Sequence, residues 1–303
     1  MSTSEINITK FNPKFAYPEH PFASNQGGMD LKIPENFVMI VKDFVKKFAR
    51  KLLSGSFNLA KLIPPAKTLH HESFLMLNAI GMAINAKYMK AAAQHKDPLE
   101  RLKLIASGLI GNLYLSDASC IGRIPIPDFP GTYLEALLSD GTYFYCEAKS
   151  RNPPSNNLKI KGPDNIYEFE VDLAQNLYLP GMSPNQIEGG FVGERSIKFK
   201  DGTEYIYTSP FFKITNALSN HKNMHYINKN RCFIWDCTNN LVCEINFIQK
   251  DNSWSKSITS LFSWNKKKVE LPLKEKNKFE LKISNATADG RCNGNVIATG
   301  SGN

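Results

Sequence analysis

One stretch of the sequence places polar and charged side chains where a strand should end. In FYCEAKSRNPPSNNL, residues 144–158, the first residues suit a half-buried strand. Lys149, Arg151 and Asn152 then precede Pro153 and Pro154, which cannot donate to a β-ladder. The whole chain has a net charge of +9, which favours anionic partners: nucleic acid, an acidic membrane face or phosphorylated ligands.

Sequence signatures of common catalytic and metal sites are missing. The chain has no GxSxG, GxxxxGK[ST], GxGxxG or HExxH motif, and its six cysteines show no zinc-like CxxC spacing. The one histidine pair, His70-His71, is a poor metal site because adjacent side chains point apart on a helix or strand. We therefore expect no catalytic residue, no metal, no cofactor and no enzymatic activity. A hydrolase with an unrecognised site is the alternative.

The first part of the chain, up to about residue 120, has helical spacing. Residues 34–53 form an apolar stripe with lysines and an arginine on the opposite face, and residues 72–94 are rich in Ala, Met and Leu. A third helix is predicted from Asp97-Pro98, an N-cap followed by proline at the first helical position. The stripe of residues 34–53 fits either a helix packed on the core or one that lies on a membrane or covers an apolar cavity.

The second part of the chain has short turn motifs between β-rich segments, as is typical of β-hairpins. Two-residue turns are predicted at Asp140-Gly141, Asp201-Gly202, Asn239-Asn240 and Asp289-Gly290, each between β-rich arms. A succession of hairpins without helices between them predicts an antiparallel meander that is closed or nearly closed.

The chain shows no targeting or membrane-spanning segment. No apolar run reaches the roughly 18 residues of a spanning helix, and the N-terminus lacks a charged start followed by an apolar core. We therefore expect a cytoplasmic protein.

Five segments, in this order, resemble the lipid-binding domain of the oxysterol-binding protein family. They are the amphipathic helix, FNLAKLIPP (57–65), DPLERL (97–102), GRIPIPDFPGTY (122–133) and EAKSRNPP (147–154). The family carries a Glu-Gln-Val-Ser-His-His-Pro-Pro fingerprint, of which Glu147, Ser150, Pro153 and Pro154 match. Its two histidines, which contact phosphoinositide phosphates, are replaced here by Arg151 and Asn152, and an upstream lysine by Arg123.

The resemblance implies an α+β fold, with an N-terminal amphipathic lid and a helical layer before a large antiparallel β-barrel that encloses a lipid tunnel. After a loose arm (1–33), a single lipid-binding domain would span 34–303, with lid and connector at 34–65, helical layer at 66–120 and barrel at 121–303. It implies a lipid head-group site at Arg123, Arg151 and Asn152. The lid and tunnel residues would be Phe44, Phe48, Leu52, Phe57, Leu59 and Leu62.

The implied function is lipid binding and transfer: one sterol or phospholipid is shielded in the tunnel and exchanged with cytosolic membrane leaflets. The partners would be that lipid and an anionic membrane surface, with peripheral membrane association, a monomeric state and no nucleic acid. The alternative is a membrane-surface scaffold or lipid sensor without transfer. A planar guanidinium such as that of Arg151 suits phosphate oxygens, although Arg151 also fits a merely solvated strand end.

Overall fold

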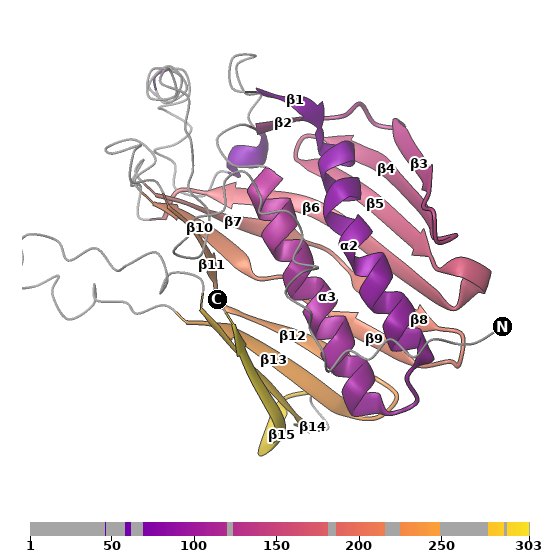
Figure 1. The fold of residues 1–303 in the computed structure, drawn as a ribbon. Coiled ribbons are helices and arrows are strands. Elements are labelled where there is room, and N and C mark those ends of the chain that lie inside the picture. The colour runs from indigo at the N-terminus through magenta and orange to yellow at the C-terminus, as the bar shows by residue number, and fades with distance from the viewer. Residues whose placement is uncertain are drawn as a thin grey trace, which may run out of the picture.

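The computed structural model describes residues 46, 58–61, 69–119, 124–180, 186–215, 225–248, 278–287 and 290–302. Two helices, α2 (Phe74–Gln94) and α3 (Pro98–Ser119), lie side by side across one face of a large sheet (Figure 1). They form the helical layer that the sequence predicted. Of the predicted lid, residues 34–53, only Lys46 is described, and it is helical. Within the described part of the chain, no helix has the length and apolar character needed to cross a membrane.

The sheet contains thirteen strands in the described part of the chain. They are β3 (Tyr133–Leu137), β4 (Tyr143–Arg151), β5 (Pro154–Lys161), β6 (Tyr167–Tyr178), β7 (Gln186–Val192), β8 (Arg195–Phe199), β9 (Glu204–Tyr207), β10 (Phe211–Thr215), β11 (His225–Lys229), β12 (Arg231–Asp236), β13 (Leu241–Phe247), β14 (Phe279–Ala286) and β15 (Cys292–Gly302). Two further strands pair in parallel, β1 (Leu69–Ser73) and β2 (Ile124–Ile126), and two 3₁₀ segments are η2 (Leu59–Lys61) and η4 (Pro163–Asn165).

Both helices begin at side chains that accept hydrogen bonds from their first turn. In α3, Asp97 Oδ1 accepts from Leu99 N at 3.0 Å, so the predicted N-cap is confirmed. In α2, Ser73 Oγ accepts from Met76 N at 3.2 Å. The sequence placed the start of this helix two residues earlier, at residue 72. The difference arises because residues 69–73 pair with β2, a contact that helical periodicity does not reveal.

The predicted hairpins at Asp140-Gly141, Asp201-Gly202 and Asn239-Asn240 are present, but their turns are longer than expected, and Asp289 of the fourth predicted turn lies outside the described residues. Asp140-Gly141 joins β3 to β4 and Asp201-Gly202 joins β8 to β9. Each turn has three residues and not two, because Leu138 N donates to Thr142 O and Phe199 N donates to Thr203 O. The third turn residue is the glycine, with φ of 85° and 88°, as in a type I turn followed by a left-handed residue.

The sheet is antiparallel and barrel-like. From β6 the strand path runs one way through β5 and β4 to β3, and the other way through β8, β9, β12, β13 and β14 to β15. The α+β class and the large antiparallel sheet are therefore confirmed. The described strands do not close into a complete barrel, because no described pairing joins β3 to β15.

A row of interruptions crosses three adjacent long strands. Strands β7 and β8 pair with the two halves of β6 in one continuous register, so they form a single strand interrupted at Gly193-Glu194. Residues 208–210 likewise separate β9 from β10, and Asn230, with φ of 69°, separates β11 from β12. The registers on either side of these interruptions place them at the same level of the sheet. We call this row of interruptions the crease.

A buried guanidinium links the helices to the sheet. Arg101, in the first turn of α3, is 5% exposed. Its Nη2 lies 2.6 Å from Asp201 Oδ2, and its Nη1 donates to Thr203 Oγ1 at 2.6 Å. Nε and Nη2 donate to the carbonyl oxygen of His95 at 3.0 and 2.6 Å. Arg101 therefore connects the turn between the helices to the β8–β9 hairpin.

The crease depends on the backbone freedom of Gly193. Its φ is 140°, and an added Cβ would collide with the carbonyl oxygen of Asp172. We expect Gly193→Ala to lower the free energy of unfolding by about 3 kcal/mol, measured by urea denaturation. The matched control is Gly202→Ala, because Gly202 also has positive φ but nothing lies within 4 Å of the added Cβ. A loss no larger than the control's would contradict this role of Gly193.

The Arg101–Asp201 pair predicts a pH dependence of stability. Partial burial alone would raise the pKa of Asp201, but hydrogen bonds from Arg101 and Thr203 outweigh it and hold the pKa at about 2, below the ordinary 3.8. A carboxyl group with a lowered folded-state pKa stabilises the fold above its unfolded pKa, and this contribution disappears as the pH falls through the folded value. We therefore expect wild type to be more stable than Asp201→Asn at pH 7 and the difference to shrink from pH 4 towards pH 2.

Thermal unfolding of both proteins across this pH range measures the effect. Asp164→Asn, at an exposed carboxylate in η4, is the control. A constant difference between wild type and Asp201→Asn at all pH values would show that the ion pair does not produce it.

Candidate functional site

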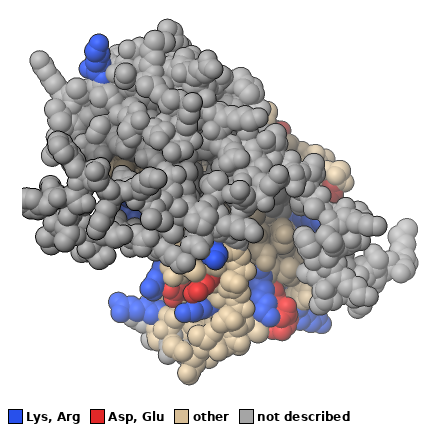
Figure 2. Space-filling view, turned by 60° about the vertical axis from the view of Figure 1, so that its left-hand side comes forward, with Lys and Arg blue, Asp and Glu red and all other residues tan. Residues whose placement is uncertain are grey.

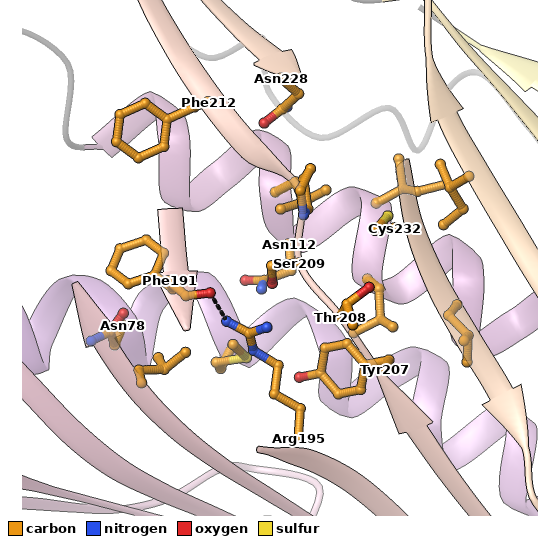
Figure 3. A pocket seen from close by; sticks show the side chains of 18 residues that line it. Asn78, Asn112, Phe191, Arg195, Tyr207, Thr208, Ser209, Phe212, Asn228 and Cys232 are labelled. Carbon is orange, nitrogen blue, oxygen red and sulfur yellow. Dashed lines mark hydrogen bonds between the residues drawn. The ribbon is translucent and has the colours of Figure 1, made fainter. Parts of the chain in front are cut away.

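A cavity of about 60 Å³ lies between the helical layer and the sheet, at the crease. Figure 3 shows the side chains that line it, which come from both helices and from strands on either side of the crease. Most of the lining is apolar, and it includes Met82, Leu109, Leu113, Leu173, Ile234 and Ile245. Such a lining excludes water and favours an apolar ligand.

One charged side chain is present in the described lining of this cavity. Arg195, the first residue of β8, is 4% exposed. Its Nη2 donates to the carbonyl oxygen of Phe191 at 2.8 Å, and its guanidinium lies 5.8 Å from the centre of the Tyr207 ring. Burial lowers the pKa of Arg195, yet a guanidinium remains charged in proteins. No described carboxylate pairs with it, so this positive charge of the cavity wall has no ion-pair partner within the described residues.

Two further polar groups of the cavity wall lack partners within the described part of the chain. The Tyr207 hydroxyl and Asn78 Nδ2 are buried and make no hydrogen bond there. Burial raises the pKa of Tyr207, so its hydroxyl stays protonated and keeps its proton for donation. Buried polar groups are normally satisfied, and each exception needs a physical explanation.

The sequence did not single out Arg195, although it contains a usable signal. In β8, burial alternates so that residues 195, 197 and 199 face the core and residues 196 and 198 face outward. A period of two therefore places Arg195 on the same face as Ile197 and Phe199. What the sequence lacks is the information that this face is the buried one with a cavity beside it.

The predicted head-group residues Arg151 and Asn152 lie at the end of β4 and in the tight turn to β5. Both are exposed, and the Arg151 guanidinium stacks on the Phe129 ring at 4.7 Å. Within the described residues Arg151 has no ion-pair partner, whereas Lys149 of the same strand binds Asp172 at 3.0 Å. At this strand end Lys149 is therefore paired within the sheet, whereas Arg151 has no ion-pair partner among the described residues.

The remaining predicted residues are only partly described. Arg123, Phe44, Phe48, Leu52, Phe57 and Leu62 lie outside the described residues, so the convergence of Arg123 with Arg151 stays a prediction. Leu59 is half-buried in η2 and does not line the cavity.

Asn58, just before η2, is a contact that the sequence did not reveal. Its Nδ2 donates to Gln175 O at 3.2 Å, and its Oδ1 accepts from Leu177 N at 2.9 Å. Asn58 thus binds the backbone of β6 as a neighbouring strand would.

The described cysteines do not have the properties of nucleophiles. Burial raises the pKa of the thiols of Cys146 and Cys232 to about 12, so both stay protonated at neutral pH. Cys232 lines the cavity and contributes to it as a small apolar group. In the part of the chain that the structure describes, no cluster of His, Cys, Asp and Glu could hold a metal ion.

The described surface carries mixed charges. Lys159 pairs with Glu170, Lys198 with Glu204, and Arg231 with Glu244, at 2.9, 3.2 and 2.9 Å. On the face shown in Figure 2, lysine and arginine side chains lie beside aspartate and glutamate side chains. The excess of positive charge therefore does not form one continuous basic patch over the described residues of that face.

Comparison with known proteins identifies sequences and structures that are similar to this chain. No protein-family model matches the chain. Oxysterol-binding protein 9 of Dictyostelium discoideum is 29% identical over 203 residues, which cover 67% of this chain and 45% of that protein. The chain thus spans about half the length of the curated relative.

Solved structures share the fold at low sequence identity. The Osh3 ORD of Saccharomyces cerevisiae, in complex with PI(4)P, superposes with a TM-score of 0.61 at 16% identity, covering 82% of this chain and 59% of that one. The Osh1 ORD in complex with cholesterol gives 0.59 at 14% identity, covering 84% and 60%. Sequence similarity and shared fold together confirm the resemblance read from the sequence: this chain is similar to the lipid-binding domains of the oxysterol-binding protein family.

Proposed function

We propose that this chain binds one lipid between its helical layer and its sheet and exchanges it with the cytosolic face of membranes. The observation that carries the proposal is the apolar cavity at the crease, in a fold whose solved examples include complexes with PI(4)P, cholesterol and ergosterol. The lipid is carried unchanged, by a monomer that associates with membranes peripherally.

The physical basis of binding is removal of apolar surface from water. Each Å² of apolar surface buried contributes about 25 cal/mol, so a lipid gains affinity from apolar walls without a specific polar contact. The described cavity of about 60 Å³ is smaller than the roughly 300–1,000 Å³ of ordinary ligand pockets. A whole sterol or acyl chain therefore needs displacement of lining side chains or space beyond this cavity.

The small volume favours a second candidate function. A lipid sensor or membrane scaffold needs the fold and a membrane-facing surface, but it does not need to enclose a whole lipid. It would associate with vesicles without extracting lipid from them.

A loading and transfer assay separates the two functions. The full chain is incubated with donor vesicles that contain a fluorescent sterol or labelled PI(4)P, and lipid is measured on the re-isolated protein and in acceptor vesicles. We expect about one lipid per protein and transfer to acceptor vesicles. Vesicle association without extracted lipid would support the sensor and contradict the carrier.

A cavity-filling variant tests the location of the lipid. Ile110 lines the cavity, so Ile110→Trp should reduce bound lipid about fivefold or more by occupying its space. Leu99→Trp is the matched control, because Leu99 packs on the same core outside the cavity. Equal loading of both variants would place the lipid elsewhere.

The proposed head-group role of Arg151 predicts salt-sensitive binding. An exposed arginine near an anionic membrane surface contributes about 1 kcal/mol, which corresponds to about fivefold in affinity. We expect Arg151→Ala to weaken binding to vesicles with anionic phospholipid by this factor at low salt, and less at high salt because exposed charges are screened. Uptake of an uncharged sterol should not change.

The matched control for Arg151→Ala is Arg231→Ala. It removes the same charge from an exposed arginine that is already paired with Glu244. Identical binding of anionic vesicles by wild type and Arg151→Ala, in sedimentation assays at two salt concentrations, would eliminate the head-group role.

A further inference from the structure

The buried guanidinium of Arg195 has no counter-ion among the described residues. Moving an isolated ionised group out of water costs far more than moving a neutral polar group, and such groups are normally paired. Arg195 has five N–H donors, and its one hydrogen bond in the described part of the chain is to the carbonyl oxygen of Phe191. A single carbonyl oxygen satisfies one donor and leaves the charge uncompensated.

Three donors in the cavity wall suit a ligand that accepts hydrogen bonds, and the hydroxyls of Thr208 and Ser209 in the same lining can either donate or accept. The Arg195 guanidinium, the Tyr207 hydroxyl and Asn78 Nδ2 all donate, and the last two have no partner in the described residues. Figure 3 shows the guanidinium directed into the space between Phe191 and Tyr207. No aspartate or glutamate is present in the described lining. An ionised carboxylate is acceptor-only and binds a guanidinium in bidentate fashion.

The rest of the cavity specifies an apolar tail on that anion. The volume of about 60 Å³ is several times the roughly 10–15 Å³ that one water needs, so it admits a carboxylate and its first methylene groups. A phosphomonoester carries nearly two charges, and a single guanidinium would leave one of them buried and unpaired. One buried cation therefore matches one carboxylate better than a phosphomonoester.

We infer that the inner end of this cavity binds the carboxylate of a single-chain lipid, with Arg195 as its counter-ion. This inference rests on the proposed function, since it names the class of lipid that enters the same space. Tyr207 and Asn78 donate to the carboxylate oxygens, and the methylene chain lies against the apolar side chains of α3 and β12. This interior anion site is distinct from the exposed residues Arg151 and Asn152, neither of which lines the cavity.

The test compares two lipids that differ in one group. Oleate and oleyl alcohol have the same chain, so their relative affinity for delipidated full-length protein isolates the carboxylate. Binding is measured at pH 8 by displacement of a fluorescent fatty acid. A buried charge-assisted pair predicts about tenfold or greater preference for oleate. This preference should depend little on salt, because dissolved ions do not reach a buried pair. Acetate should not compete at the concentrations at which oleate binds.

Variants assign the preference to Arg195. Arg195→Met should bind oleate and oleyl alcohol with similar affinity, and Arg195→Lys should keep part of the preference because it keeps the charge. Arg231→Met, at an exposed paired arginine, is the matched control and should behave as wild type. Circular dichroism checks that each variant folds. The comparison of the two lipids on wild type does not depend on any variant.

The outcomes separate this inference from the proposed function. Equal affinity of wild type for oleate and oleyl alcohol, together with bound sterol or phospholipid, would overturn the carboxylate site and leave the lipid carrier intact. Competition by acetate at the concentrations at which oleate binds would show a small-anion site and overturn the lipid assignment. Failure to bind any of these lipids would contradict the proposed function itself.

Discussion

The crease across three adjacent strands is the constraint on which the rest of the structure depends. A regular sheet would pack evenly under the helical layer and leave no space between the two. The ladder is interrupted at one level at Gly193, at residues 208–210 and at Asn230. The cavity lies along this line, and two of its polar residues border the interruptions: Arg195 follows Gly193-Glu194, and Tyr207 precedes residues 208–210.

Two buried arginines, Arg101 and Arg195, differ in how completely their guanidinium groups are hydrogen-bonded. Arg101 is fully engaged, with Asp201, Thr203 and backbone carbonyls around its guanidinium. A pair of this kind specifies one arrangement of the helices on the sheet, and its removal leaves buried groups unsatisfied. Arg195 has one carbonyl oxygen and an aromatic ring. Buried polar groups without full hydrogen bonding occur mainly at functional sites. The difference in hydrogen bonding therefore suggests a structural role for Arg101 and a ligand-binding role for Arg195.

The sequence was most informative where a few neighbouring residues determine the local backbone. Asp-Gly pairs located the hairpins, Asp97-Pro98 located the start of α3, and the order of short motifs indicated the family. The sequence was least informative where a local structure depends on contacts with residues far away in the chain. The start of α2 depends on pairing with β2, and the role of Asn58 depends on β6, more than one hundred residues away. The sequence did not single out Arg195: alternation in β8 places it on the face of Ile197 and Phe199, but only the packing of α2 and α3 shows that this face holds a cavity.

The two cations assigned to ligands act in different dielectric environments, and this difference divides their proposed roles. Arg151 is exposed on the strand end, where its field is screened within about 8–10 Å at physiological salt. It therefore affects how often and how firmly the protein meets an anionic surface, and bulk salt weakens that effect. Arg195 is buried in apolar surroundings, where the attraction between opposite charges is several times stronger and screening is weak. In the proposed role, an anion bound to Arg195 therefore stays bound after the protein dissociates from the membrane. A lipid carrier requires this property, and an exposed arginine does not supply it.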